Sequence, residues 1–181
     1  MEAFDPAGFF EFDGGSGQVH ARGGARVLML SDAVLGPLVA AAVQSGDLTA
    51  VRRLGKHMGE LVRGSIGGAP EEAPAEAVLG RARAVLGLYG WGALDVERWG
   101  DALVARLSHA PVLDEDHLAM AALLGGLMSS LAHREVACVP VSNDGAYMMV
   151  EPHIAEEVWG WARAGESVGH IVDRLAPGGE P

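Results

Sequence analysis

Apolar residues recur at two different spacings along the chain, and these spacings predict both strands and helices. Apolar or alternating runs of strand length occupy residues 9–12, 18–22, 26–30, 93–98, 102–107, 135–141 and 146–150. Apolar residues recur at helical spacing in residues 32–44, 49–63, 75–88, 115–132, 153–161 and 167–175.

Turn-forming residues separate two pairs of the predicted strands. Residues 99–101 contain a glycine between the runs 93–98 and 102–107, and Asn143-Asp144-Gly145 precedes the run 146–150. Both pairs are therefore expected to be antiparallel hairpins. Together they predict an α+β fold, in which an antiparallel sheet of about four strands packs against a helical layer. Residues 1–152 would form this domain with a short N-terminal leader, and residues 153–181 a helical extension packed on or beside it.

Two stretches are almost free of charge, residues 27–46 and 117–133. Each is interrupted by polar or small residues and flanked by helix-capping signals, so we expect buried helices and no membrane span. The helix at 49–63 is amphipathic instead, with Met58 on the apolar side and Arg52 among the charged residues that stay outside.

Composition and charge narrow the possible partners and compartment. The 181 residues are 49% apolar and 20% charged, which is typical of a globular domain. A net charge of −11 disfavours binding to nucleic acid or anionic lipid. The single cysteine, Cys138, allows no intramolecular disulfide, and no secretion signal is recognisable at the N-terminus. The sequence therefore favours a protein of the reducing cytoplasm.

Four short motifs occur in the order found in one known domain family. They are Gly24-Ala25-Arg26-Val27-Leu28, Leu54-Gly55-Lys56-His57-Met58-Gly59, Tyr89-Gly90-Trp91-Gly92-Ala93-Leu94-Asp95-Val96, and Leu123 to Leu131 followed by Val136–Val141 and Tyr147–Val150. In this order they resemble the 4-vinyl reductase (4VR) domain, which is related to core subunits of the transport protein particle (TRAPP) complex. The resemblance covers roughly residues 20 to 152.

The resemblance implies an antiparallel sheet packed on helices, a homodimer formed through helices, and no established catalytic triad. Relatives of this kind hold a small hydrophobic effector or serve as subunits of larger assemblies. Some bacterial regulators of the family place paired cysteines around zinc. Because the corresponding stretch here contains only Cys138, a zinc-linked sensor is not expected.

No residue pattern indicates catalysis, a metal or a cofactor. The histidines show no ligand spacing, since His117 and His133 lie about four helical turns apart. Paired acidic residues lie at predicted loop tips or helix starts, where the helix dipole favours them. Cys138 lies in a predicted buried strand without a basic neighbour in sequence that would activate its thiol.

Small and flexible apolar side chains supply the candidate binding residues. Glycines on two predicted helices allow close approach of another helix, of a second subunit or of a ligand. Methionines adapt their shape to varied partners, although ordinary core packing also explains them. A ligand site would be lined by Met58, Leu61, Met120, Leu124 and Met128, and an interface by Gly55, Gly59, Gly125, Trp159 and Trp161.

The sequence thus favours a non-enzymatic binding, scaffold or regulatory module that homodimerises and could hold a small hydrophobic ligand. The C-terminal helices, outside the resemblance, are the expected surface for a protein partner. The alternative is an enzyme or enzyme accessory that acts on a hydrophobic molecule in the same cavity. A third hypothesis, a purely structural protein, predicts assemblies larger than a dimer.

Overall fold

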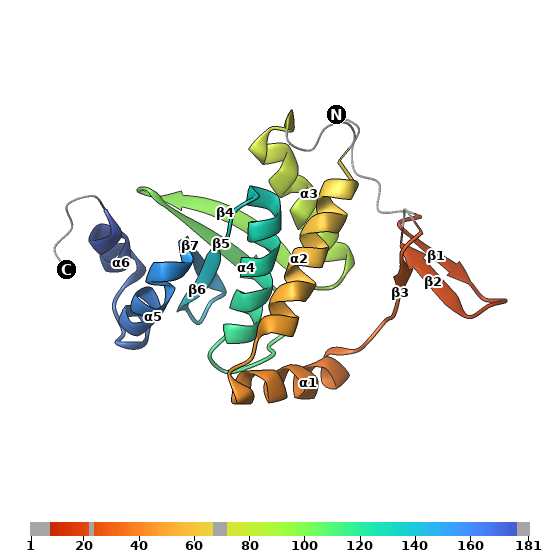
Figure 1. The fold of residues 1–181 in the computed structure, drawn as a ribbon, viewed down its shortest axis with the longest axis horizontal. Coiled ribbons are helices and arrows are strands. Elements are labelled where there is room, and N and C mark those ends of the chain that lie inside the picture. The colour runs from red at the N-terminus through yellow and green to blue at the C-terminus, as the bar shows by residue number, and fades with distance from the viewer. Residues whose placement is uncertain (1–7, 22–23, 67–71, 177–181) are drawn as a thin grey trace.

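An antiparallel four-stranded sheet forms the centre of the protein, as predicted. The computed structural model describes residues 8–21, 24–66 and 72–176. Strands β4 (Ala93–Trp99), β5 (Ala102–Ser108), β6 (Ala137–Ser142) and β7 (Ala146–Val150) lie in the order β4-β5-β7-β6 (Figure 1). Each neighbouring pair is antiparallel, so both predicted hairpins and the α+β class are confirmed.

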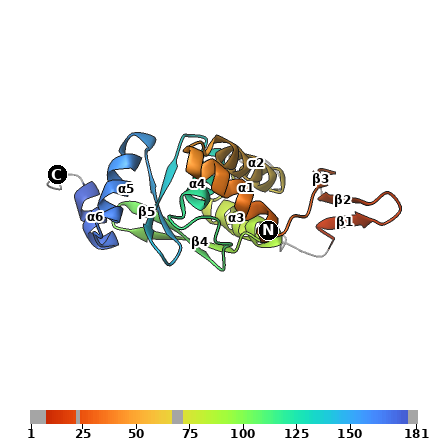
Figure 2. The same ribbon diagram turned by 90° about the horizontal axis from the view of Figure 1, so that it is seen from below.

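Helices cover both faces of this sheet. Along β5, Ala105 and Leu107 belong to the larger apolar core, whereas Val104 belongs to a second, smaller cluster. This alternation follows from the two-residue period of a strand. The larger core includes residues of α2 (Thr49–Gly64), α3 (Ala75–Leu88) and α4 (Leu118–Ala132). The smaller cluster includes residues of η2 (Pro152–Ile154), α5 (Ala155–Arg163) and α6 (Val168–Leu175), and Figure 2 shows α5 and α6 at one end of the molecule.

Helices α2 and α4 lie side by side against the sheet and touch through glycines (Figure 1). A Cβ at position 55 would lie 1.9 Å from the carbonyl oxygen of Leu123, and one at position 126 would lie 2.0 Å from that of Arg52. Only a residue without a side chain allows the two backbones to approach this closely. The two helices therefore pack with their backbones in direct contact, and both contribute residues to the larger core.

The start of α4 differs from the prediction. The helix was expected from Glu115 but begins at Leu118, because the Asp114 carboxylate accepts hydrogen bonds from the backbone N–H groups of Leu118 and Ala119 at 2.8 and 2.9 Å. His117, immediately before the helix, has a left-handed backbone with φ 57°. Asp114 thus satisfies two of the free N–H groups of the first turn from outside the helix.

The N-terminal part of the described chain forms a second sheet beside the main body. Strands β1 (Phe10–Asp13), β2 (Gln18–Ala21) and β3 (Arg26–Val27) are antiparallel in the order β1-β2-β3 (Figure 1). Phe9 and Phe10 stack edge-to-face on Tyr89 at the end of α3, with ring centroids 6.1 and 5.4 Å apart.

Two predictions about this region are wrong. The strand expected at residues 26–30 ends at Val27. Val27 pairs with Val19, and the partner strand β2 begins at Gln18, so β2 has only one more residue that could pair beyond Val27. The helix expected to be buried, α1 (Asp32–Ser45), is largely exposed, and Val39 is its one buried residue. No helix in the described part of the chain is long and apolar enough to cross a membrane.

Candidate functional site

Four of the five predicted ligand-lining residues come together in the larger core. Met58 of α2 and Met120, Leu124 and Met128 of α4 are each at most 2% exposed and belong to one apolar cluster. Leu61 is half-buried on α2 and does not belong to that cluster. The sequence thus identified a methionine-rich part of the core, and the binding role of these residues stays a prediction.

Two polar groups of the sheet lie in the same cluster, Cys138 on β6 and Tyr147 on β7. Burial raises the pKa of the Cys138 thiol to about 12, although the Arg52 guanidinium acts in the opposite direction. Burial also raises the pKa of Tyr147, and the nearby Asp114 carboxylate adds to that rise. Both groups are therefore neutral at physiological pH and suit an uncharged ligand better than an anion.

Tyr147 is the functional candidate that the sequence did not single out. It is 2% exposed, its ring lies edge-to-face with His117 at 6.5 Å, and no hydrogen bond to another described residue contributes to its pKa. The signal available in the sequence was a polar aromatic residue in an otherwise apolar strand, Ala146–Val150.

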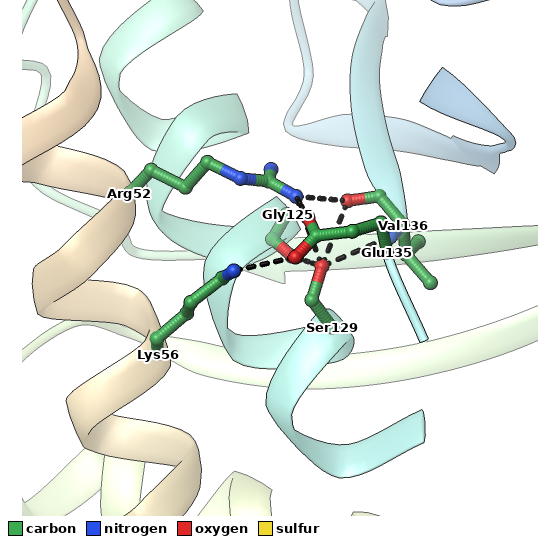
Figure 3. A network of polar contacts seen from close by, with 6 residues as sticks. All are labelled: Arg52, Lys56, Gly125, Ser129, Glu135 and Val136. Carbon is green, nitrogen blue, oxygen red and sulfur yellow. Dashed lines mark hydrogen bonds and ion pairs between the residues drawn. The ribbon is translucent and has the colours of Figure 1, made fainter. Parts of the chain in front are cut away.

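A polar network joins α2, α4 and the chain entering β6, beside this core (Figure 3). Nη2 of Arg52 donates to Ser129 Oγ, Val136 O and Glu135 Oε2 at 3.0, 2.9 and 2.6 Å. Nζ of Lys56 lies 2.5 Å from the other carboxylate oxygen of Glu135. Arg52 was expected on the outside of its helix, so that prediction is wrong. Its side chain instead reaches across α4 at Gly125, where a Cβ would lie 2.6 Å from Arg52 Nη1.

Ser129 lies at the buried end of the network. Its Oγ accepts from the backbone N–H of Val136 at 2.9 Å and lies 2.6 and 3.1 Å from the carbonyl oxygens of Gly125 and Val136. One hydroxyl therefore ties α4 to the start of the sheet strand that carries Cys138.

Glu135 makes the stability that the network contributes depend on pH in the acidic range. Hydrogen bonds from Lys56 and then Arg52 lower the pKa of Glu135 from 4.5 to about 2. Because the folded-state pKa lies below the unfolded one, this stabilisation is fully present above about pH 4.5 and is lost as the pH falls toward about 2. We expect wild type to lose more stability than Glu135→Gln between about pH 6 and about pH 3.

Urea unfolding of both proteins at the two pH values measures this difference. Glu11→Gln, at an exposed position of β1, is the matched control and should lose as much stability as wild type. An equal loss in wild type and Glu135→Gln would show that the ion pairs with Arg52 and Lys56 contribute nothing to stability.

The glycines proposed as interface residues lie in contacts within the chain. Gly55 and Gly59 face the α4 backbone and Ser130, and Gly125 faces the Arg52 side chain. Trp159 and Trp161 are half-buried against the smaller cluster, with the Arg174 guanidinium 4.1 Å above the Trp161 ring. A role of these residues between subunits or toward a protein partner stays a prediction.

A shallow depression lies on the sheet at strands β4 and β5. It is lined mainly by polar residues of β4 and β5 together with Asp144. Arg106 forms ion pairs there with Asp144 at 2.8 Å and with Glu97 at 3.7 Å. Within the described residues, no group of three histidine, cysteine, aspartate or glutamate side chains is placed to hold a metal ion.

Comparison with known proteins gives a match in structure but none in sequence. No protein-family model matches the chain, and no curated protein is significantly similar to it. A solved structure, that of the phenol-responsive sensory domain of the transcription activator PoxR with phenol, superposes with a TM-score of 0.58. The match covers 87% of this chain and 90% of that one, at 14% sequence identity. This chain shares the fold of a sensory domain.

The likeness to the PoxR sensory domain extends over nearly all of both chains, so it supports the α+β architecture as a whole. At 14% identity it establishes the fold alone. The 4VR and TRAPP resemblance receives no direct test from it.

Proposed function

We propose that this protein is a small-molecule-binding regulatory module of 4VR-like fold, which homodimerises and holds a small hydrophobic ligand. The observation that carries the proposal is the fold shared with the PoxR sensory domain, whose structure contains phenol. A fold alone does not specify a ligand. The proposal therefore also depends on the chemistry of the core described above.

The binding region we propose lies between α4 and the sheet. Met120, Leu124 and Met128 supply apolar side chains there, and Tyr147 supplies a neutral hydroxyl in the same cluster. Ligand pockets typically combine an apolar lining with a few fixed polar groups, and methionine side chains can repack around an added molecule. A small aromatic alcohol fits this combination, since its ring and its hydroxyl each find a complementary group.

Tyr147→Phe tests the proposal because it removes only the hydroxyl. We expect phenol and benzene both to raise the melting temperature of wild type, with phenol binding the more tightly. In Tyr147→Phe the affinity for phenol should fall about tenfold, equivalent to one lost hydrogen bond of about 1.4 kcal/mol, while that for benzene stays unchanged. Isothermal titration calorimetry measures both affinities.

Tyr89→Phe is the matched control, since Tyr89 is the other tyrosine of the chain and its ring stacks on Phe9 and Phe10 at the edge of the larger core. It should bind both probes like wild type. If neither phenol, benzene nor hexanol binds wild type, the small hydrophobic ligand is refuted. If both probes lose affinity equally in Tyr147→Phe, the hydroxyl is not the group that recognises phenol.

A further inference from the structure

An exposed apolar surface lies where the N-terminal sheet joins the main body. Large apolar side chains are concentrated within eleven residues of the chain, and most of each is open to solvent. These are Leu28, Met29, Leu30, Val34 and Leu38, which are 76, 59, 60, 51 and 64% exposed. Together they expose on the order of several hundred Å², a size at which an apolar patch usually marks an interaction site.

Helix α1 forms part of this surface, although its sequence is that of a helix buried on all sides. Asp32 is its one charged residue, yet Val39 is its one buried residue. Leu35 and Val43 pack against the larger core, whereas Val34 and Leu38 point away from it to solvent. A helix with apolar residues all round is normally covered on more than one face.

The chain just before α1 has a free sheet edge. Strand β3 pairs with β2 on one side only, since it is the last strand of the N-terminal sheet. The chain then continues through residues 28–31 without a helix or turn, and Ser31 has an extended backbone with φ −73° and ψ 155°. Unpaired backbone groups at such an edge can pair with a strand of another chain.

The charges around this segment are arranged symmetrically. Arg26 and Asp32 are both exposed, and each lies three residues from Met29. The Asp32 carboxylate accepts a hydrogen bond from the N–H of Ala33 at 2.8 Å, and neither residue forms an ion pair with another described residue. Two copies of the segment placed antiparallel about Met29 would bring Arg26 of each copy opposite Asp32 of the other, and Leu28 opposite Leu30.

We propose that a second copy of this chain covers this surface, by antiparallel pairing of residues 27–31 about Met29. Arg26 of each copy then lies toward Asp32 at the start of the other copy's α1, and Val34 and Leu38 of α1 pack at the junction. Such a contact is self-complementary, as a two-fold dimer requires, and joins two three-stranded sheets edge to edge. The contact has a pair of opposite charges at each end and apolar residues at its centre. The inference rests on the homodimer of the proposed function and gives that dimer a location.

Exchange of the two charges tests the pairing. Arg26→Asp places two acids opposite each other at both ends of the contact, and Asp32→Arg places two bases there. Each single variant should weaken the dimer at least tenfold, and the double variant Arg26→Asp/Asp32→Arg should recover most of the wild-type affinity. Sedimentation equilibrium measures the dissociation constants, and circular dichroism melting checks that every variant is folded.

A cysteine at the proposed two-fold axis gives an independent test. In Met29→Cys the two new thiols face each other, so mild oxidation should yield a covalent dimer. Val112→Cys is the control, because Val112 is 77% exposed and lies far along the chain from the contact. The native Cys138 is buried and should not interfere.

The possible outcomes separate this surface from the other proposals. A dimer that is insensitive to the charge changes and does not cross-link through position 29 would overturn the surface while leaving the homodimer intact. A monomeric wild type would overturn both. Phenol and benzene binding, measured on the same samples, reports on the ligand proposal separately, since the proposed ligand region lies in the core under α4.

Discussion

Gly55→Ala is expected to destabilise the folded protein by about 3 kcal/mol, although it adds only one methyl group. The new Cβ would lie 1.9 Å from the Leu123 carbonyl oxygen and 2.8 Å from its carbonyl carbon. Both are backbone atoms in the middle of α4, so no rotamer change can make room. Helices α2 and α4 would have to separate, and the larger core between them and the sheet would lose packing.

The matched control for this substitution is Gly80→Ala. Gly80 lies within α3, is exposed, and has no heavy atom within 4 Å of the position of a Cβ. Alanine favours a helix over glycine, so Gly80→Ala should stabilise the protein by about 0.5–1 kcal/mol. Guanidinium unfolding of both variants gives the two opposite signs. A loss in Gly55→Ala below about 1 kcal/mol would mean that the two helices are not held as closely as described.

The close contact of α2 and α4 explains which parts of the fold the sequence could predict. Elements that depend on periodicity and turn residues were predicted well, such as α3 at Ala75–Leu88 and the hairpin of β6 and β7. The paired glycines signalled close approach, but the pattern alone left open whether the neighbour was a helix of the same chain, a second subunit or a ligand. The structure places Gly55 and Gly59 against α4 of the same chain.

The wrong prediction for the Arg52 side chain has its cause in the same contact between α2 and α4. Helical periodicity places Arg52 with the charged residues of α2. Gly125 lacks the side chain that would block its path, so the guanidinium reaches Ser129 and Glu135. Acceptors 77 and 83 residues away in sequence cannot be recognised from a local pattern.

The candidate ligand region was predicted only in part, also for a physical reason. Methionines and leucines at helical spacing indicated the face of α4 that meets the core, and the structure brings Met58, Met120, Leu124 and Met128 together. Tyr147 joins them through the pairing of β7 with β5 and β6, which depends on strand register. The exposure of α1 likewise depends on the neighbours that the fold provides, because its composition alone predicted burial.

Ser129→Ala is expected to be the most damaging change within the polar network, at about 2–3 kcal/mol of folding stability. Ser129 is 6% exposed, and its Oγ accepts the backbone N–H of Val136 at 2.9 Å and Nη2 of Arg52 at 3.0 Å. Alanine would leave the Val136 N–H buried without an acceptor. An unpaired buried donor costs more than the net value of the hydrogen bond that it loses.

Ser130→Ala, at the next position of α4, is the control, because it removes a serine hydroxyl from the same helix without removing the acceptor of the Val136 N–H. Ser130 is partly exposed, no hydrogen bond from its hydroxyl to a described residue is present, and alanine keeps the Cβ that packs near Gly59. We therefore expect a change below about 0.5 kcal/mol. Urea unfolding measures both variants, and hydrogen exchange at Val136 shows whether the amide has lost its acceptor. Equal stability of the two variants would indicate that water replaces the Ser129 hydroxyl, and that the strand β6 is held by the Arg52 contacts instead.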